Sequence, residues 1–224
     1  MEDKYVAAMR KYHEKECSPV FFRHFDRGNE NYSNTDIDPD RTDENYNLAP
    51  DHGMDTYTYY RQEYRRLENE GALIRPDLVT CAGWIVTLPQ ELKAQPRHIQ
   101  QRFFKTTYEF LCDRYGAPDR HNILSANVHN DETTPHMHFM FMPTAMKNGV
   151  ENFQAKYILN RYDMTTFHPD LQEYLNHHGV MANVNSGITK AQGGNKTIEE
   201  LKAMSREHEK TKERTIDYTK DITY

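Results

Sequence analysis

The chain has 224 residues, of which 37% are hydrophobic and 28% charged, and its net charge is −6. This length fits one large domain or one domain with an appendage, and no apolar run approaches the roughly 20 residues that a membrane span needs. The three cysteines form no CxxC pair, which excludes a zinc knuckle and a disulfide framework and favours a reducing cytoplasm. Because proteins that hold DNA by general electrostatics are usually basic, a nucleic-acid function here requires charge concentrated in one groove.

The first third of the chain contains a predicted strand, a long polar segment and a predicted helix. Residues 5–9 (YVAAM) have the composition of a short strand. Residues 14–55 are rich in Asn and Asp, contain three prolines and show little apolar periodicity, which predicts a long loop with a functional role. A helix is predicted over residues 56–69, because apolar side chains recur at i, i+4 and i+7. They are Tyr60, Tyr64 and Leu67.

The middle of the chain alternates strand and helix patterns. Residues 78–88 form a β-branched, apolar run that predicts a central strand. Residues 96–115 predict a strong helix that begins near Pro96 and is closed by Gly116. Its apolar face consists of Ile99, Phe103, Phe104, Tyr108, Phe110 and Leu111. Residues 123–129 and 136–142 predict two strands, and the Thr-Pro turn between them indicates an antiparallel hairpin.

The last third predicts a helix over residues 163–179, a short strand over 180–185 and a charged helix that begins after Thr197. This order of elements predicts an α+β fold in which helices flank a central antiparallel sheet. We expect residues 1–195 to form the folded domain. Residues 196–224 are expected to form a charged helical extension that connects to a C-terminal region beyond this chain.

The most informative motif is HNDETTPHMH, which contains His129, Glu132, His136 and His138. His136 and His138 are two residues apart on a predicted strand, so their side chains share one face of the sheet. His129 ends the preceding strand, and the turn folds it back beside them. Three histidines with open positions are typical of a catalytic metal site, and Glu132 is placed as a fourth ligand or as an orienting partner. We expect the intervening apolar residues to face helices while the histidine face opens to a cleft.

One divalent ion is the expected cofactor, with Mn, Mg, Zn, Co and Ni all compatible and Mg disfavoured by imidazole ligands. The sequence contains no HExxH, GxSxG, Walker A or GxGxxG pattern, which argues against a zincin protease, an α/β-hydrolase and the common nucleotide-binding folds. A Gly-Gly-Asn turn at residues 193–195 is flanked by Lys190 and Lys196. Its backbone N–H groups could meet a phosphate, although an ordinary solvated loop fits the same residues.

Four segments in the right order resemble the MobV (Mob/Pre) family of plasmid relaxases, which belong to the HUH endonucleases. The first is RHFDRGNENYSNTDID at residues 23–38, which continues to DENYNL at 43–48. The second is IRPDLVTCAGW at residues 74–84, and the third is VHNDETTPHMHFMFMP, the histidine motif itself. The fourth is GGNKTIEELK at residues 193–202. Together these matches cover nearly the whole chain.

The resemblance implies an HUH-like relaxase domain that nicks and rejoins one DNA strand at the transfer origin of a plasmid or mobile element, for conjugative mobilisation. His24 matches the family nucleophile, which would yield a 5′-phosphohistidine and a free 3′ hydroxyl. His129, His136 and His138 match the metal triad, Glu132 matches the adjacent acid, and manganese is the ion most expected. Implied partners are single-stranded or hairpin DNA at the origin and a coupling protein of the conjugation machinery. A bacterial, cytoplasmic protein without membrane contact from this segment is expected.

The sequence departs from the family pattern at Phe25, where Asn is common, and at Asp26, where Glu is usual. Asp26 or Glu30 would hold the second ring nitrogen of His24 and so fix its tautomer. Tyr32 and Tyr46 are alternative nucleophiles, since many HUH enzymes use tyrosine. The residues expected to contact DNA are Arg23, Arg27, Asn34, Arg41, Arg75, Lys190 and Lys196.

Two other readings of the same residues stay open at this point. In the first, the chain is a metal-dependent phosphodiesterase that activates water and forms no covalent adduct. In the second, it is a non-catalytic origin-binding protein whose metal is structural. Loss of His24 separates both of them from a relaxase with a histidine nucleophile, because only that mechanism requires this side chain.

Overall fold

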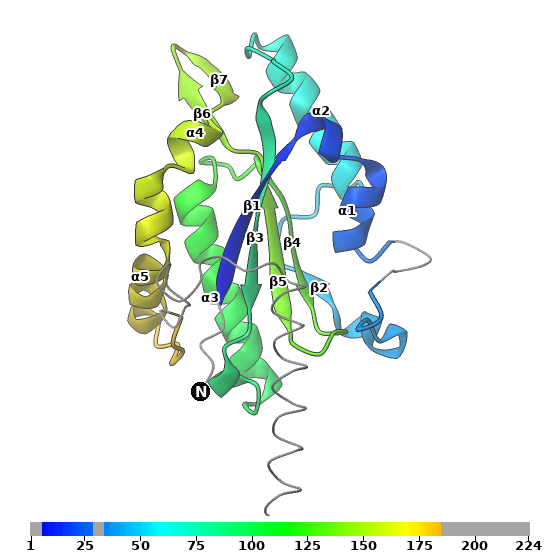
Figure 1. Cartoon of the computed structure of the whole chain (residues 1–224), viewed down its shortest axis with the longest axis vertical. Helices are drawn as coiled ribbons and strands as arrows, with labels where there is room; N and C mark the ends of the chain where they lie inside the picture. Colours follow the sequence, from blue (N-terminus) through cyan, green and yellow to red (C-terminus); the bar gives the residue numbers. More distant parts are fainter. Residues whose placement is uncertain (1–5, 29–33, 185–224) are drawn as a thin grey trace, which may run out of the picture. The chain divides into compact units, whose positions relative to one another are not determined.

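A five-stranded antiparallel sheet runs through the computed structural model, which describes residues 6–28 and 34–184 (Figure 1). The strands are β1 (Ala7–His13), β2 (Tyr46–Asn47), β3 (Val79–Thr87), β4 (Ile123–His129) and β5 (His136–Phe141). Their order across the sheet is β1-β3-β5-β4-β2, so the predicted β4–β5 hairpin lies at its centre, beside β3. Every neighbouring pair is antiparallel.

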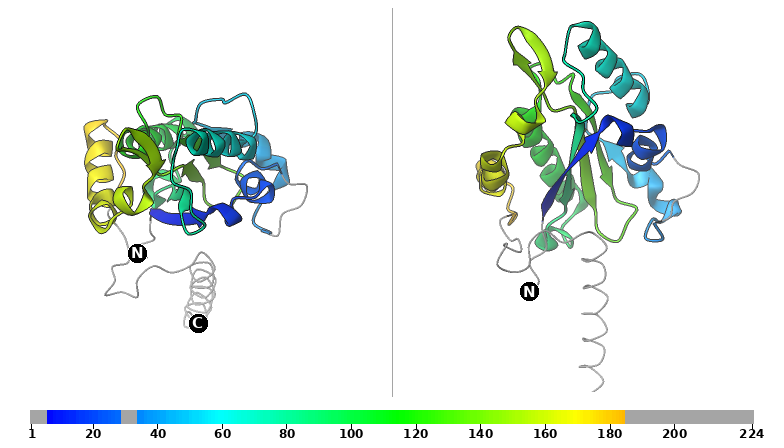
Figure 2. Two further views of the ribbon diagram at one scale, coloured as in Figure 1. Left: turned by 90° about the horizontal axis from the view of Figure 1, so that it is seen from above. Right: turned by 45° about the horizontal axis from the view of Figure 1, so that its top comes forward.

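Helices cover both faces of this sheet (Figures 1 and 2). One face packs against α3 (Arg97–Tyr115) and α5 (Arg161–His177), and the other against α1 (Pro19–Phe25) and α2 (Thr56–Asn69). Alternation along β5 divides its side chains accordingly. Met137, Phe139 and Phe141 belong to the core under α3 and α5, whereas Met140 belongs to the core under α1 and α2. The predicted α+β fold, with an antiparallel sheet flanked by helices, is confirmed.

The predicted helices and central strands lie close to their expected positions. Helix α2 begins where Asp55 caps it by accepting a hydrogen bond from the Thr58 N–H, and its Tyr60, Tyr64 and Leu67 are buried. Helix α3 follows Pro96, ends before Gly116 and buries five of the six side chains predicted for its apolar face, with Ile99 partly buried. Helix α5 begins at Arg161, two residues before its predicted start, and continues through Pro169.

Several elements differ from the predictions. The polar segment expected to be a loop contains α1, which starts at the capping residue Ser18 and at Pro19, together with the short 3-10 helices η1 (Glu14–Glu16) and η2 (Pro39–Glu44). A further 3-10 helix, η3 (Gln90–Leu92), follows β3. Strand β1 begins two residues later than predicted and extends to His13. The dense Asn and Asp content around α1 obscured the Ser-Pro start signal and the apolar residues that follow it.

A hairpin of β6 (Thr144–Lys147) and β7 (Val150–Phe153), followed by α4 (Ala155–Ile158), was not predicted. Its turn is Asn148–Gly149, and both residues have positive φ, which is the Asn-Gly signature of a tight hairpin. In contrast, the strand predicted at 180–185 does not form over residues 180–184. Val180 and Val184 are buried against the core instead, and Gln172 of α5 holds this segment through Ala182 O and Val184 N–H.

The described residues belong to one compact unit. The predicted boundary at 195/196 and the predicted C-terminal helix lie outside them. Within the part of the chain that the structure describes, no helix is both long and apolar enough to cross a membrane.

Candidate functional site

Three histidines meet on the face of the sheet that α1 covers. His129 of β4 lies directly opposite His136 of β5, and Asn127 lies opposite His138. Opposed residues point to the same face, so all these side chains gather there. The Nε2 atoms of His136 and His138 are 3.0 Å apart, and one ligand atom from each histidine lies within 4.8 Å of the other two. The structure therefore brings the three predicted metal ligands together.

Backbone carbonyls fix the tautomers of two of these rings. His129 Nε2 lies 2.7 Å from the Phe25 carbonyl, and His136 Nδ1 lies 2.9 Å from the Thr134 carbonyl. Because a carbonyl only accepts hydrogen bonds, each of these nitrogens carries the proton. The lone pairs remain on His129 Nδ1 and His136 Nε2. His129 Nδ1 is buried and has no hydrogen-bond partner among the described residues, as expected of a nitrogen that serves as a metal ligand.

Burial keeps two of the three histidines, His129 and His138, neutral. It lowers the pKa of His129 to about 3, with smaller contributions from the charges of His136 and Arg27. Burial also lowers the pKa of His138 well below its usual range, again with help from its histidine neighbours. A neutral imidazole is the form that binds metal, so these two ligands are ready at neutral pH without losing a proton.

The donor set fits a divalent cation. Besides the three imidazoles, the Glu132 Oε1 atom lies 4.0 Å from His136 Nε2, and His129, Asp131 and Glu132 form a second convergent group. Mixed nitrogen and carboxylate donors are compatible with manganese and with the other ions considered above.

The last turn of α1 is docked directly on this cluster. The Phe25 carbonyl accepts the His129 proton, and its ring packs on the His138 ring with 4.8 Å between centroids. Two residues later, Arg27 forms a two-pronged ion pair with Asp131, with both distances 2.9 Å, and donates to Glu132 Oε1 at 2.7 Å. The side chain of Arg27 is 5% exposed and that of Asp131 is fully buried. The sequence predicts that Arg27 contacts DNA phosphates, whereas in the structure its guanidinium is held inside the protein by these carboxylates.

Arg27 also adopts a backbone conformation that favours glycine. Its φ is +55°, and the Gly28 N–H bonds to the Arg23 carbonyl at 2.9 Å, which closes α1 with a Schellman-type turn. A non-glycine residue in this region costs about 1–2 kcal/mol. The turn directs the Arg27 side chain onto Asp131.

Asp131 also accepts hydrogen bonds from two side chains that the sequence did not reveal as its partners. It accepts hydrogen bonds from Asn45 Nδ2 at 2.7 Å and from Thr42 Oγ1 at 3.3 Å. Asn45 in turn accepts from the Asn130 N–H at 2.6 Å. The segment around η2 is thereby fastened to the β4–β5 turn. Both Asp131 and Asn45 lie inside the family-like motifs, which is the only sequence signal that pointed to them.

His24 lies on the last turn of α1, beside the residues that contact the triad. Its side chain retains solvent contact. Partial burial lowers the pKa of His24, as do the charges of Arg27 and His136, while Glu132 opposes them. His24 directly precedes Phe25, whose carbonyl and ring contact His129 and His138, so it belongs to the turn that is docked on the metal ligands. The lowered pKa keeps its imidazole neutral at pH 7, the form in which one ring nitrogen has a free lone pair.

The two departures from the family pattern have different structural roles. The Phe25 carbonyl accepts a hydrogen bond from His129, and the Phe25 ring packs on the His138 ring. Ring packing thus takes the place of the side-chain amide that is common in the family at this position. Asp26 accepts hydrogen bonds from Thr56 Oγ1 at 3.0 Å and from Asn127 Nδ2 at 2.8 Å. Its carboxylate therefore ties α1 to α2 and β4. Glu30, the other predicted partner of His24, lies outside the described residues.

The predicted DNA-contacting residues are dispersed. Arg23 is exposed on α1 next to His24. Arg41 is 43% exposed and pairs with Glu44 at 3.3 Å. The Asn34 side chain accepts a hydrogen bond from its own loop, at the Asp36 N–H. Lys190 and Lys196 lie outside the described residues.

The geometry of the sheet disfavours two other predictions, the DNA contact of Arg75 and the nucleophile role of Tyr46. Arg75 precedes the start of β3, whereas Thr87 at the other end of β3 pairs with His136, so Arg75 lies at the end of the sheet away from the histidines. Tyr46 of β2 pairs with Val128, which faces the core under α3, so its ring lies on the opposite face of the sheet from the triad. This placement argues against Tyr46 as the alternative nucleophile. Tyr32 lies outside the described residues.

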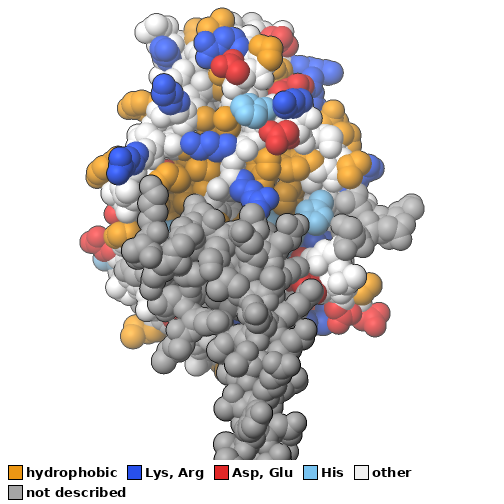
Figure 3. Space-filling model, viewed as in Figure 1, with side chains coloured by type: hydrophobic (Ala, Val, Ile, Leu, Met, Phe, Trp, Pro, Cys, Tyr) orange, Lys and Arg blue, Asp and Glu red, His pale blue; other side chains and the backbone are white. Residues whose placement is uncertain are grey.

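The histidine face is more enclosed than we predicted. His129 and His138 are buried, and only His136 keeps partial exposure, because the unpredicted helix α1 covers this face. On the side of the molecule seen in Figure 3, basic side chains are interspersed with acidic and apolar ones over the described residues. On this side of the molecule, an anionic ligand would therefore meet positive charge at individual side chains.

Three imidazoles converge on the central hairpin of an antiparallel sheet. The end of a helix that carries a fourth histidine, His24, closes the site. These features define an α+β protein with a histidine metal site. Residues 1–203 match the family described as "Plasmid recombination enzyme" (Mob_Pre), and the chain belongs to this family. It is 32% identical over 186 residues to a plasmid recombination enzyme of Streptococcus agalactiae, which covers 81% of this chain and 35% of the relative. A plasmid recombination enzyme of Lactiplantibacillus plantarum is 30% identical over 188 residues, covering 84% of this chain and 50% of the relative. The chain thus spans half or less of the length of these relatives.

Solved structures agree with this assignment. The MobM relaxase domain (MOBV; Mob_Pre) bound to plasmid pMV158 oriT DNA, in a Mn-bound crystal structure at pH 6.8, is 28% identical with a TM-score of 0.73. The match covers 89% of this chain and 97% of that one. A further Mn-bound structure of the same domain with oriT DNA, at pH 6.5, gives a TM-score of 0.68 at 29% identity, covering 89% of this chain and 97% of that one. The chain accordingly has the fold of a MOBV relaxase domain.

Proposed function

We propose that this chain is a relaxase domain of the HUH type. It makes a site- and strand-specific nick in single-stranded DNA at a transfer origin and later rejoins the strand, as conjugative mobilisation requires. His24 is the nucleophile, and His129, His136 and His138 hold one divalent metal ion, manganese being the favoured one. The family assignment and the Mn-bound, oriT-bound MobM relaxase structures support this proposal.

The observation that carries the proposal is the docking of the α1 end on the histidine triad. A structural metal site would need only the three histidines, whereas here the turn that follows His24 is bonded to the ligand His129 and to the acids beside it. Two independent links, one neutral and one charged, hold the turn. Such double attachment fits a nucleophile that must be positioned accurately against a metal-bound group.

The metal site would be formed by the neutral nitrogens of His129, His136 and His138, with Glu132 beside them. When bound, a divalent cation there would withdraw charge from a non-bridging phosphate oxygen and orient the phosphorus. Glu132 is also held by Arg27, so its negative charge is partly compensated and its position is fixed.

His24 supplies the reacting lone pair. One ring nitrogen attacks the phosphorus and forms an N–P bond, while the bond from phosphorus to the 3′ oxygen breaks. The departing oxygen takes a proton and becomes the free 3′ hydroxyl, and the second ring nitrogen of His24 gives up its proton once the ring is phosphorylated. The reverse sequence of steps rejoins the strand. Arg23, exposed on the same helix, is suited to hold an adjacent phosphate of the bound strand.

The proposed setting follows from the family. The substrate would be single-stranded or hairpin DNA at a transfer origin, and a coupling protein of the conjugation machinery is the expected protein partner in a bacterial cytoplasm. The basis is similarity to MobM structures that hold plasmid oriT DNA. Arg23, Asn34, Arg41 and Arg75 remain proposed DNA contacts, and the placement of Arg75 restricts it to DNA that extends to the far end of the sheet.

Cleavage under controlled metal supply tests the function. The full chain is incubated with labelled single strands that tile the DNA flanking its gene, with Mn²⁺ or with a chelator. We expect one strand to be cut at one position, only with metal, and His136→Ala to raise the Mn²⁺ concentration needed by at least tenfold. Turnover of many strands per protein without any adduct would indicate the water-activating phosphodiesterase. Origin binding without cleavage would indicate the non-catalytic reading.

A further inference from the structure

Two cysteines lie together in the core beneath α1 and α2. All three cysteines of the chain have free, buried thiols. Side chains alternate along β3, so Cys81 faces α1 and α2, whereas its neighbour Ala82 belongs to the core under α3 and α5. Cys81 pairs with Tyr12 near the end of β1, and from there the chain turns through η1 to Cys17, directly before the residue that caps α1. The fold thus places Cys17 and Cys81 in one buried cluster, although they are far apart in the sequence.

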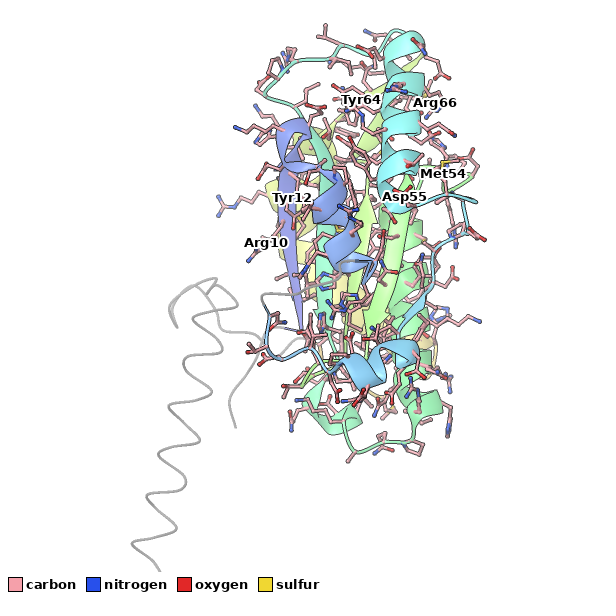
Figure 4. All side chains as sticks on the ribbon, turned by 90° about the vertical axis from the view of Figure 1, so that its right-hand side faces the viewer. Arg10, Tyr12, Met54, Asp55, Tyr64 and Arg66 are labelled. Atoms are coloured by element: carbon pink, nitrogen blue, oxygen red, sulfur yellow. The ribbon has the colours of Figure 1, made fainter. Side chains whose placement is uncertain are left out.

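The turn between β1 and α1 is held by packing and by the backbone. Tyr12 lies on β1 beside α1 (Figure 4), and its ring meets the ring of Phe21 with 4.7 Å between centroids. The Cys17 N–H donates a hydrogen bond to the Glu14 carbonyl at 3.1 Å, which closes η1. Cys17 therefore has a fixed position over β3.

The two thiols belong to a small polar cluster inside this core. Cys17 and Cys81 are hydrogen-bonded to each other, and Cys17 also interacts with the hydroxyls of Tyr60 and Thr80. Those two hydroxyls share a hydrogen bond of 2.7 Å. All four side chains are buried, and apolar residues surround them. The sulfur atoms of Cys17 and Cys81 are therefore neighbours in the folded chain.

The two thiols differ in acidity and in access. The hydrogen bond from Cys81 lowers the pKa of Cys17, and the hydroxyls of Tyr60 and Thr80 add to this effect. Burial raises the pKa of the Cys81 thiol well above its usual range. Cys17 is 5% exposed and Cys81 is 0% exposed. Because the thiolate is the form that attacks an oxidant, Cys17 is suited to attack and Cys81 to resolve the product.

We propose that Cys17 and Cys81 form a redox modification site, at which a peroxide converts the two thiols into a reversible disulfide between α1 and β3. The Cys17 sulfur attacks one peroxide oxygen and the O–O bond breaks, which gives a sulfenic acid and one water. The Cys81 sulfur then attacks the Cys17 sulfur, the S–O bond breaks, and the oxygen leaves as a second water with the thiol proton. Two thiols thereby lose two electrons, and hydrogen peroxide is reduced to two waters. An external thiol reverses the change by exchange.

The disulfide fastens the start of the helix that carries His24. The end of α1 is already bonded to His129 through the Phe25 carbonyl. Because α1 has only seven residues, it depends on tertiary contacts for its stability, and a covalent link at its start restrains its opening. We expect oxidation to slow hydrogen exchange of the α1 amides by roughly tenfold or more. This inference does not depend on DNA cleavage, since both the disulfide and the exchange are measured on the chain alone.

Peptide mass spectrometry after oxidation of the folded chain tests the pair. The full chain is reduced, freed of reductant, treated with hydrogen peroxide, and then alkylated during denaturation so that the remaining thiols are marked. We expect linked peptides that contain Cys17 and Cys81, recovery of both thiols with dithiothreitol, and an alkylated Cys112. Cys81→Ala should abolish the link. Cys112→Ser is the matched control and should retain it, because Cys112 lies in the core on the other face of the sheet.

The chain unfolded in urea shows which link arises without the fold. There the link between Cys81 and Cys112 should prevail, because these residues are nearer in sequence and a shorter loop costs less entropy to close. The same link in the folded chain, links between chains, or oxidation of Cys17 alone would overturn the proposal. Survival of all three thiols in the folded chain, at a peroxide concentration that oxidises the unfolded one, would overturn it too. A disulfide that leaves the exchange of α1 unchanged would contradict the fastening of that helix.

Discussion

At the scale of single residues, the buried pair of Arg27 and Asp131 is the contact on which the site depends most. Asp131→Ala leaves an arginine charge inside the protein without its main partner, so we expect the free energy of unfolding to fall by about 3–5 kcal/mol. Urea denaturation measures this. Asp77→Ala is the matched control, because Asp77 is 77% exposed and pairs with Arg75 at 3.5 Å, and its loss should cost less than about 1 kcal/mol. Equal effects of the two changes would contradict the role given to Asp131.

The pH dependence of cleavage distinguishes the nucleophiles. Partial burial lowers the pKa of His24 below 6.5, and its protonated ring has no lone pair, so the rate should fall as pH drops through that lowered value. Titration of His129 and His138 does not obscure this fall in rate, because burial holds the pKa of His129 at about 3 and that of His138 well below its usual range. We expect cleavage at saturating Mn²⁺ to reach its plateau by pH 7. A rate that keeps rising to pH 10 would point to a tyrosine instead.

At the scale of secondary-structure elements, His121 links the start of β4 to the β6–β7 hairpin. Both of its ring nitrogens contact carboxylates, Nδ1 that of Asp119 and Nε2 that of Glu151 at 3.0 Å. Burial alone would lower the pKa of His121, but the two carboxylates outweigh it and raise the pKa above 6.5. The stabilising contribution is therefore complete below pH 6.5 and is lost as the pH rises through the raised value.

The direction of this pH dependence gives a direct prediction for His121→Gln. The variant should be less stable than the unmodified chain at pH 6, and the gap should narrow at pH 9, as thermal unfolding at the two pH values would measure. An equal loss of stability at both pH values would mean that the His121 side chain stabilises the fold through packing rather than through its charge.

Periodicity and end signals were sufficient for the elements whose side chains alternate or repeat regularly. The bounds of α2, the β4–β5 hairpin and the convergence of His129, His136 and His138 all follow from local spacing. Helix α1 was missed because its seven residues lie in an Asn- and Asp-rich segment. The attachment of α1 to the triad was not predictable, since the Phe25–His129 contact joins residues 104 positions apart and depends on the folded chain. The same holds for the ion pair between Arg27 and Asp131, which reversed the expected role of Arg27.

At the scale of the whole molecule, an acidic chain is expected to bind an anionic partner through local features. The described unit provides such a feature in the enclosed histidine cluster, where the end of α1 that carries His24 contacts the ligand His129. The chain spans 35% of its Streptococcus relative, so functions of the remaining length belong to other parts of such proteins.

The most direct test of the central claim is the identity of the residue that becomes attached to DNA. The chain, His24→Ala and Tyr46→Phe are incubated with Mn²⁺ and a labelled single-stranded substrate, and the products are separated on a denaturing gel. We predict an acid-labile protein–DNA adduct that forms with the unmodified chain and with Tyr46→Phe and is absent with His24→Ala. Cleavage that persists in His24→Ala, or an adduct that disappears only in Tyr46→Phe, would contradict the account.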